Sequence, residues 1–247
     1  MSPVDRTDAP RVADVHNGTI MPTDARCLVE TDDSSATVRL TGVLDRAGVE
    51  AVAGTLLGRC WARPGPVLVD LSGVRITDPR AREALDEIRG AIADWPAADL
   101  LFVSGDRPVP RPAGVPPELL DVELPPVVEA AREARALVTE GCTRWGLPEL
   151  AEPACIAVTE MVNNVVAHAA TPMTLRLAPR GSALHLAVRD HAAGRPTYAG
   201  PAPVDSVGGR GLLLIDVVAR RWGSTPLPDG KVVWCVLHAE DETAFRN

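Results

Sequence analysis

Lysine, aromatic residues and long apolar segments are all scarce in this sequence. Lys231 is the one lysine among 25 basic residues, and aromatic residues make up 3% of the 247 positions. No uninterrupted apolar run approaches the roughly 18 residues of a membrane span, and the first residues do not combine a basic segment with an apolar one. We therefore expect no membrane span and no signal peptide, and we expect a cytoplasmic protein.

The charge and the cysteines argue against two further classes of protein. The net charge is −8 and no basic stripe is present, so a direct nucleic-acid partner is not expected. The five cysteines are dispersed and form no C-x-x-C pair. They are typical of reduced thiols rather than of a disulfide framework or a zinc site. With 46% hydrophobic and 23% charged residues, the composition is otherwise that of a globular protein.

Proline marks the boundary between two segments of domain size. Residues 1–25 are polar and aperiodic, which predicts a disordered tail. Five prolines lie within residues 104–118, a composition typical of neither helix nor strand. We therefore expect a linker over residues 106–122 between two domains, one at 26–105 and the other at 123–240.

The first domain alternates strand and helix patterns. Apolar residues with period two or in short continuous runs predict strands at 36–44, 67–74 and 99–105. Helical spacing predicts a helix at 46–61 and a second helix that begins after Asp78, which can cap it. This order favours an α/β sheet covered by helices, with at least some parallel pairing.

The second domain has a different order, in which helices precede and interrupt a mostly antiparallel sheet. We expect an α+β two-layer sandwich there. Asp229–Gly230 is a typical hairpin dipeptide, and the long loop before the third helix is typical of a functional lid. The expected elements are helices at 126–145, 150–169 and 211–222, strands at 173–179 and 183–190, a loop at 191–209 and a closing hairpin.

The stretch EMVNNVVAHA at residues 160–169 is the most informative part of the sequence. Glu160, Asn164 and His168 recur at i, i+4 and i+8, so one helix face would present a carboxylate, an amide and an imidazole. Amide and carboxylate oxygens suit Mg²⁺, and the carboxylate alternatively suits a general base acting on a hydroxyl. The spacing alone fits equally well a polar helix face that meets solvent.

Two later segments favour a nucleotide site. Asp190 ends an apolar strand, where its carboxylate can accept a hydrogen bond from an exocyclic amine. The sequence GGRG at residues 208–211 precedes a helix, and such glycines let backbone N–H groups approach a phosphate at the positive end of the helix dipole. Arg210 can add charge-assisted hydrogen bonds.

These motifs resemble the ATPase domain of bacterial anti-sigma factor serine kinases, within the wider superfamily of gyrase, Hsp90 and histidine kinases. EMVNNVVAHA resembles the E-L-V-x-N-A-x-x-H box of that family, RDHAAG its D-x-G-x-G box, and GGRGLLLID its second glycine box. The closing W-G…G-K-x-V-W pattern also matches, and the resemblance covers residues 125–238. It implies a two-layer α/β sandwich of the histidine kinase-like ATPase type, with ATP and Mg²⁺ as ligands.

The resemblance also implies a role for each site residue. Asn164 would be the Mg²⁺ ligand, Glu160 the base that activates a substrate serine, and Asp190 the residue that binds adenine. The residues implied at the phosphates are Gly209, Arg210 and Gly211. The other residues of the expected nucleotide-binding set are His168, Gly194 and Leu212.

Two positions depart from the family pattern, and a third, Lys231, has a structural interpretation beside a functional one. Ala192 replaces the middle glycine of the D-x-G-x-G box, which would narrow the conformational freedom of the lid. Val232 replaces the Thr expected after Gly-Lys, which removes a hydroxyl that would support adenine contacts. Lys231 is expected to lie in solvent at a hairpin end, with a phosphate contact as the alternative.

The first domain resembles a STAS domain, the fold of anti-sigma factor antagonists, over residues 27–105. DLSGVRITDP at residues 70–79 matches the D-L-S-x-V-x-x-x-D-S motif of that family, whose final serine is the phosphorylation site. Pro79 occupies that position here, so the acceptor hydroxyl is missing, although proline suits the first turn of a helix. Ser72 and Thr77 are neighbouring hydroxyls that nothing in the sequence marks as substitutes.

Together the two resemblances predict an anti-sigma factor-type regulator that transfers the γ-phosphate of Mg–ATP to a serine of a separate STAS-domain antagonist. The alternative is a non-catalytic module that binds a nucleotide and also binds a sigma factor or an antagonist. Ala192, Val232 and Pro79 favour that alternative, whereas Glu160 and Asn164 favour the kinase. We expect the STAS-like domain to act as a constitutive docking or autoregulatory surface, and homodimer formation is left open.

Overall fold

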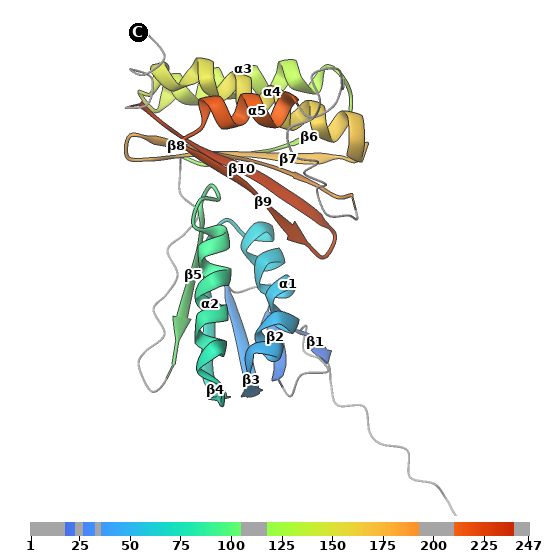
Figure 1. Cartoon of the computed structure of the whole chain (residues 1–247), viewed down its shortest axis with the longest axis vertical. Helices are drawn as coiled ribbons and strands as arrows, with labels where there is room; N and C mark the ends of the chain where they lie inside the picture. The colour runs from blue at the N-terminus through green and yellow to red at the C-terminus, as the bar shows by residue number, and fades with distance from the viewer. Residues whose placement is uncertain (1–17, 23–26, 33–35, 105–117, 193–209, 240–247) are drawn as a thin grey trace, which may run out of the picture.

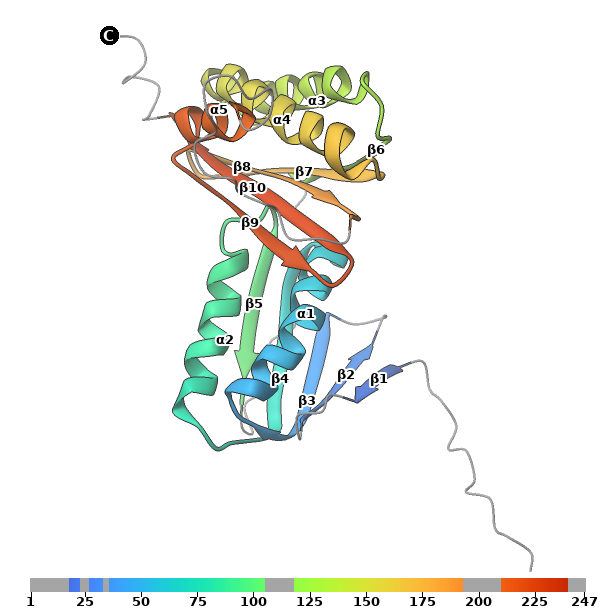
Figure 2. The same ribbon diagram turned by 45° about the vertical axis from the view of Figure 1, so that its right-hand side comes forward.

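Two five-stranded sheets, one from each half of the chain, form the framework of the molecule (Figure 1). The computed structural model describes residues 18–22, 27–32, 36–104, 118–192 and 210–239. We call residues 18–104 the N-terminal half and residues 118–239 the C-terminal half. Each sheet is built from strands of one half only, and the two halves meet where helix ends of the first contact the sheet of the second (Figure 2).

The sheet of the N-terminal half combines antiparallel and parallel pairing. Its order is β1-β2-β3-β4-β5; the first three strands are antiparallel, and β3, β4 and β5 are parallel. The expected parallel pairing is therefore present, with α1 and α2 packed on one face of the sheet. The elements are β1 (Gly18–Pro22), β2 (Cys27–Asp32), β3 (Thr37–Leu44), α1 (Arg46–Ala62), β4 (Gly65–Ile76), α2 (Pro79–Ile92) and β5 (Ala98–Val103).

Strand β1 lies inside the segment that was expected to be a disordered tail. It pairs antiparallel with β2, with Ile20 opposite Glu30. Its five residues are too few to produce a periodic signal, and the strand depends on hydrogen bonds to β2 that the local sequence does not reveal. Residues 1–17 and 23–25 of the expected tail lie outside the described residues.

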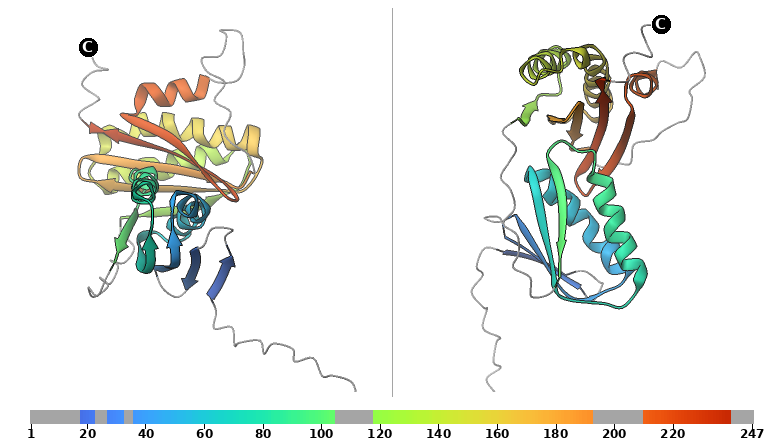
Figure 3. Two further views of the ribbon diagram at one scale, coloured as in Figure 1. Left: turned by 60° about the horizontal axis from the view of Figure 1, so that its bottom comes forward. Right: turned by 90° about the vertical axis from the view of Figure 1, so that its left-hand side faces the viewer.

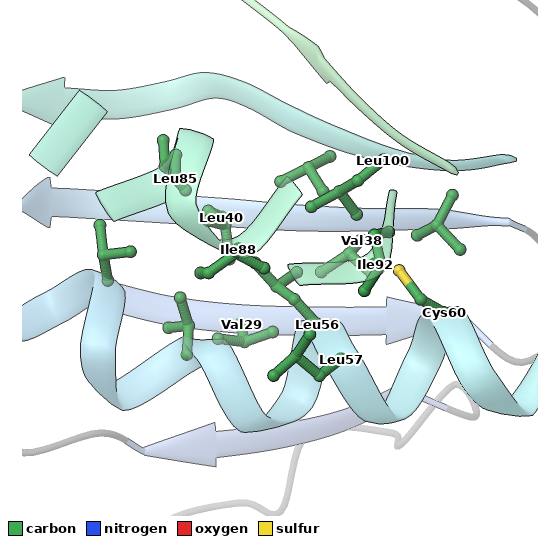
Figure 4. Close-up of a cluster of buried hydrophobic side chains, with 14 of the residues drawn as sticks. Val29, Val38, Leu40, Leu56, Leu57, Cys60, Leu85, Ile88, Ile92 and Leu100 are labelled. Atoms are coloured by element: carbon green, nitrogen blue, oxygen red, sulfur yellow. The ribbon is translucent and has the colours of Figure 1, made fainter. Parts of the chain in front are cut away.

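Helix α2 begins as the sequence predicts. Asp78 is its N-cap, and the Asp78 side chain accepts a hydrogen bond from the backbone N–H of Arg80 at 2.9 Å. Pro79 occupies the first turn and is exposed, and its missing N–H costs no hydrogen bond within the helix. The buried face of α2 includes Leu85 and Ile88, which point towards the sheet (Figure 4).

The core of the N-terminal half lies between its sheet and its two helices (Figure 4). Val38 and Leu40 point into it from β3, where buried and more exposed residues largely alternate. Leu56 of α1 is fully buried against this face. Full burial of such a side chain is worth about 1.5–3 kcal/mol, so this layer carries most of the stability of the half.

The sheet of the C-terminal half is antiparallel throughout, in the order β6-β7-β8-β10-β9. Helices α3, α4 and α5 form a layer on one face, which agrees with the expected two-layer sandwich (Figure 1). A 3-10 turn (Pro148–Leu150) precedes α4 and a π-helical turn (Val165–Ala169) follows it. The other elements are β6 (Leu120–Leu124), α3 (Ala130–Arg144), α4 (Ala151–Asn164), β7 (Met173–Arg180), β8 (Ala183–Asp190), α5 (Arg210–Val218), β9 (Arg221–Leu227) and β10 (Gly230–His238).

Two boundaries in the C-terminal half differ from the sequence prediction. Strand β6 begins inside the expected linker at 106–122 and forms the sheet edge beside β7. The helix expected at 211–222 ends at Val218, and Trp222 belongs to β9 instead. In both places the pairing of a strand with its neighbour overrides the local pattern. The expected closing hairpin is present, with Gly230 as the first residue of its second strand.

The C-terminal sheet is covered on both faces (Figure 3). All eight residues of β8 are buried. Leu186 and Val188 pack in the core under the helices, whereas Ala187, between them, packs in the core of the N-terminal half. Successive side chains of a strand point to opposite faces, so β8 is buried along its whole length because a separate layer covers each face.

The second face of this sheet binds the C-terminal end of α2. The last carbonyl groups of a helix have no partner within the helix. Arg180 donates a hydrogen bond to the carbonyl of Ala93 at 3.0 Å, and Nδ1 of His185 lies 2.9 Å from the carbonyl of Asp94. Arg221 adds two hydrogen bonds of 2.7 Å to the Asp94 carboxylate. Cationic donors suit this helix end, which carries the negative end of the dipole.

Helix α1 makes a second contact with the same face of the sheet. The guanidinium of Arg176 lies 4.2 Å from the ring centroid of Trp61 and pairs with Asp121 at 2.9 Å. At the hairpin tip, Pro228 packs so closely on Gly54 that a Cβ at position 54 would lie 2.9 Å from the Pro228 ring. The two halves are therefore joined by ring contacts, hydrogen bonds and the Arg221–Asp94 ion pair as well as by the chain itself.

Candidate functional site

Helix α4 presents two polar side chains beside the C-terminal sheet. Glu160 and Asn164 are one turn apart and half-buried, as their i, i+4 spacing predicts. Among the described residues, neither side chain has a hydrogen-bond or ion-pair partner. The residues that bury the opposite face of α4 are Ala154, Ala157, Val158, Met161 and Val162.

The segment that carries His168 is not part of the continuous α-helix that the sequence predicted. The α-helix ends at Asn164, and Val165–Ala169 forms a π-helical turn. The turn closes with a 2.8 Å hydrogen bond from the N–H of Ala170 to the carbonyl of Val165, and Ala170 is left-handed with φ of 49°. The wider turn gives His168 a different rotation about the helix axis from that of an α-helix, and its side chain is exposed. Such π turns are frequent at functional sites.

Asp190, the last residue of β8, lies under the same helix layer. Its side chain is 1% exposed. Val188, two positions earlier on the same face, packs in the core formed with the helices, so Asp190 also projects to that side. Its Oδ1 accepts a hydrogen bond from the N–H of Ala192 at 3.1 Å. The structure thus places a buried carboxylate on the sheet face that α4 covers.

Lys231 is not the solvated hairpin end that the sequence suggested. Its Nζ lies 2.6 Å from Oδ2 of Asp190, and 19% of its side chain is exposed. The two residues are direct partners across β8 and β10. Gly230 has φ of 145° and approaches β8 so closely that a Cβ would overlap the carbonyl of Asp190. Sequence reasoning missed this pair because the two residues lie 41 positions apart.

Val232 points to the other face of the sheet. Its side chain is fully buried and packs in the core of the N-terminal half. The expectation that Val232 removes an adenine contact is therefore wrong for this chain, because residue 232 does not face the helix layer. Lys231 is the residue of β10 that lies beside Asp190 on that side.

The glycine-rich segments are described only in part. Gly194 and Gly209, both expected near the nucleotide, lie outside the described residues. Arg210 and Gly211 are the first residues of α5, which begins one residue before the start predicted at 211. Leu212 is partly buried against the core between the helices and the sheet. A 2.9 Å hydrogen bond from Nε1 of Trp222 to Asp216 holds α5 against β9.

The segment DLSGVRITDP at residues 70–79 lies at the end of β4 and the start of α2. Asp70 accepts a hydrogen bond from the N–H of Ser72 at 2.9 Å and pairs with Arg39 at 3.3 Å. The hydrogen bonds from Ser72, supported by Arg39, hold the pKa of the Asp70 carboxyl below its usual value. Ser72, Thr77 and Pro79 are all exposed. Pro79 lies about 20 Å from the end of α2 that binds the C-terminal half.

Metal-ligating groups are sparse in the described part of the chain. No group of three His, Cys, Asp or Glu side chains lies close enough there to hold an ion, and none of the five cysteines forms a disulfide. A Mg²⁺ ion keeps several waters and shares phosphate oxygens, so one amide oxygen such as that of Asn164 suffices as the protein ligand. The Asn164 amide therefore fits a metal that arrives with a nucleotide.

Two further features bear on the sequence expectations. None of the helices within the described ranges has both the length and the hydrophobicity needed to cross a membrane.

An open groove of about 770 Å³ lies between α3 and α4, and the residues that line it include Thr139 and Cys155. It contains none of the candidate site residues, so it is separate from the face that carries Glu160 and Asn164.

Comparison with known protein families finds a match in the C-terminal half. Residues 124–236 match the family model of the histidine kinase-like ATPase domain. No curated protein matches the chain. The family match spans Glu160, Asn164 and Asp190, and it supports ATP binding by this domain. It does not extend into the N-terminal half.

Proposed function

We propose that the C-terminal half is an anti-sigma factor-type serine/threonine kinase, which transfers the γ-phosphate of Mg–ATP to a serine of a separate STAS-domain antagonist. The supporting observation is the pair of Glu160 and Asn164, adjacent on α4 and without partners among the described residues, within a histidine kinase-like ATPase domain. A buried carboxylate, Asp190, lies on the sheet face that the same helix covers.

Each residue of this set has a distinct task in the proposed reaction. Asn164 would bind Mg²⁺, which neutralises charge on the phosphates. The substrate serine oxygen would attack the γ-phosphorus, the bond from that phosphorus to the bridging oxygen would break, and ADP would leave. Glu160 would accept the hydroxyl proton. Arg210 and Gly211 at the start of α5 would add positive potential near the phosphates.

The N-terminal half would act in this proposal as a fixed STAS-like docking surface. Its attachment to the C-terminal sheet leaves the edge that carries Ser72, Thr77 and Pro79 exposed at the far end. Pro79 has no hydroxyl to receive phosphate, so this surface would not be switched as in the antagonists it resembles. Phosphopeptide mapping after incubation with Mg–ATP should find no phosphate on residues 72–80. High occupancy on Ser72 or Thr77 would contradict this role.

The direct test of the kinase is transfer of labelled phosphate. The purified full chain would be incubated with γ-labelled ATP, Mg²⁺ and STAS-domain proteins recovered from the same cells by affinity capture. Label on a serine of a captured STAS protein, lost when EDTA removes Mg²⁺, is the expected result. The absence of label on every captured STAS protein, with ATP binding intact, would reject the kinase.

A non-catalytic binding module is the second candidate function. The ion pair between Lys231 and Asp190 favours it, because the base-binding carboxylate is already compensated. In this case the chain would bind nucleotide and hold a sigma factor or an antagonist without phosphoryl transfer. A stable complex that forms equally well with ATP and with a non-hydrolysable analogue would identify this function.

A further inference from the structure

The tip of the β9–β10 hairpin lies between helix α1 and the candidate nucleotide site (Figure 2). We call residues 227–231 the hairpin tip. Leu227 packs in the core of the N-terminal half. Pro228 lies on Gly54 of α1, where a Cβ at position 54 would be 2.9 Å from the proline ring. One side of the hairpin tip is therefore packed against the N-terminal half.

The other side of the hairpin tip is fixed to the last two residues of β8. Asp229 pairs at 2.6 Å with Arg189, whose side chain is largely buried. Gly230 approaches β8 so closely that a Cβ there would overlap the carbonyl of Asp190. Nζ of Lys231 lies 2.6 Å from Oδ2 of Asp190. Three consecutive residues of the tip thus hold the end of β8, through two ion pairs and one close backbone contact.

These contacts fix the direction of the Asp190 carboxylate. Oδ1 accepts the N–H of Ala192 at 3.1 Å, Oδ2 pairs with the ammonium of Lys231, and 1% of the side chain is exposed. A carboxylate oxygen has two acceptor positions, so Oδ2 can also accept the exocyclic amine of adenine. A hydrogen bond weakens steeply as its distance and angle depart from the optimum. The strength of the contact with adenine therefore depends on where the hairpin tip lies.

We propose that the N-terminal half sets the affinity of the nucleotide site through the hairpin tip, with Gly54 and Pro228 as positioning residues for Asp190. The inference rests on the proposed function, since it takes Asp190 as the residue that binds adenine. Val52 and Leu56 anchor α1, because both are fully buried in the core of the N-terminal half. Added bulk at position 54 therefore displaces the hairpin tip rather than the helix, since closely packed interiors transmit strain.

The experiment compares two glycines that lie one helical turn apart on α1. Gly54→Ala places a methyl group against the Pro228 ring, whereas an added Cβ at Gly58 meets no atom of the described residues within 4 Å. Both substitutions raise helix propensity alike, so a general change in stability does not distinguish them. Calorimetric titration in excess Mg²⁺ should show about fivefold weaker ATP binding for Gly54→Ala and a change below about 1.5-fold for Gly58→Ala. Unchanged or tighter binding by Gly54→Ala would overturn the proposal.

A second substitution tests whether the effect passes through the Pro228 ring. Pro228→Ala removes the ring atoms that the new methyl group meets. The double variant Gly54→Ala/Pro228→Ala should therefore bind ATP within about twofold of Pro228→Ala alone, because the two sites are coupled. If Gly54→Ala still costs the full fivefold in the Pro228→Ala chain, the ring does not transmit the effect and the inference is wrong.

A nucleotide analogue tests whether the effect reaches Asp190. Purine riboside triphosphate lacks the exocyclic amine and is otherwise the same as ATP. Its dissociation constant should change by less than about twofold in Gly54→Ala, because it has no amine to donate to the displaced carboxylate. An equal loss of affinity for the two nucleotides would show that the hairpin tip does not act through Asp190, and the proposal would be rejected.

The outcomes also separate this inference from the proposed function. If wild type binds neither nucleotide at millimolar concentration, both ideas fail. If wild type and Gly54→Ala bind ATP equally well, the nucleotide site remains and the role of the hairpin tip alone is rejected.

Discussion

The two halves of the molecule have similar layers, but their sheets differ in how much of each face is buried. Each has a five-stranded sheet with helices on one face. In the N-terminal half, β3 alternates largely between buried and more exposed residues, and Leu28 of β2 and Leu101 of β5 are among the exposed apolar side chains. In the C-terminal half, every residue of β8 is buried. The difference arises because the ends of α1 and α2 cover the second face of the C-terminal sheet.

This difference assigns separate tasks to the two faces of one sheet. The helix-covered face carries Asp190 and Lys231 beside α4, whereas the face covered by the N-terminal half carries Arg176, His185 and Val232. Side chains on alternate positions of β8 and β10 thus serve either the candidate site or the contact between halves. Variants on the helix-covered face should affect nucleotide binding or phosphate transfer. Variants on the opposite face should affect the contact between the two halves.

The largest effect is expected at the proposed base. Glu160→Gln should lower phosphate transfer by about 10²–10⁴-fold while ATP affinity changes only severalfold, because the amide cannot accept the hydroxyl proton. Transfer of labelled phosphate to the STAS protein that wild type modifies is the measurement. Glu152→Gln, an exposed carboxylate on the same helix, is the matched control and should be silent. Full transfer by Glu160→Gln would place the base elsewhere.

The next largest effect concerns the metal ligand. Asn164→Ala should weaken ATP binding by about 100-fold in the presence of Mg²⁺ and have little effect in EDTA, because the amide oxygen acts through the ion. Calorimetry with and without Mg²⁺ measures the difference. Asn163→Ala changes the adjacent exposed amide and should bind as wild type does. Equal losses for the two variants would show that Asn164 has no special position on α4.

A smaller effect is expected on the opposite face of the sheet. Arg221→Ala leaves the Asp94 carboxylate, 14% exposed, without its two hydrogen bonds. Because the Arg221 side chain is itself half-exposed, we expect a loss of about 1–2 kcal/mol in the free energy of unfolding, measured in urea. Arg89→Ala removes a solvent-exposed pair with Asp86 on the same helix and should cost less than about 0.5 kcal/mol. Similar losses for Arg221→Ala and Arg89→Ala would mean that the Arg221–Asp94 contact adds no more to stability than an exposed ion pair does.

The smallest effect is a dependence of stability on pH. Burial is the main cause that lowers the pKa of His185, with Arg180 and Arg221 acting in the same direction and Asp94 opposing them. At a given pH, the unfolded chain therefore binds a proton on His185 more readily than the folded chain does. Neutral His185 contributes its full stabilisation above the ordinary histidine pKa. This contribution is lost as the pH falls through that value towards the lower pKa of the folded chain. The urea midpoint of unfolding should fall less between pH 7.5 and pH 5.5 for His185→Gln than for wild type. An identical fall would remove His185 as the cause.

The sequence predicted the elements well where local patterns decide them. Asp78 and Pro79 start α2 as predicted, and the i, i+4 pair on α4 is present. Predictions were less successful where distant residues decide the structure. β1 and β6 form because neighbouring strands offer hydrogen bonds, and neither segment has a pattern of its own.

The candidate site shows the same limit. A periodic pattern of the α-helix cannot anticipate the π-helical turn that contains His168. Lys231 and Val232 are adjacent in sequence, and only the register of β10 against β8 decides which of them lies beside Asp190. Register depends on the pairing of whole strands, so a motif match alone could not assign it.

Hydrogen–deuterium exchange of the full chain, with and without saturating Mg–ATP, tests the central claim that nucleotide binds on the helix-covered face of the C-terminal sheet. The account predicts slower exchange in peptides that cover residues 158–170, 186–192 and 230–234, with residues 37–76 of the N-terminal half little changed. Protection confined to the N-terminal half, or no protection anywhere at saturating nucleotide, would contradict it.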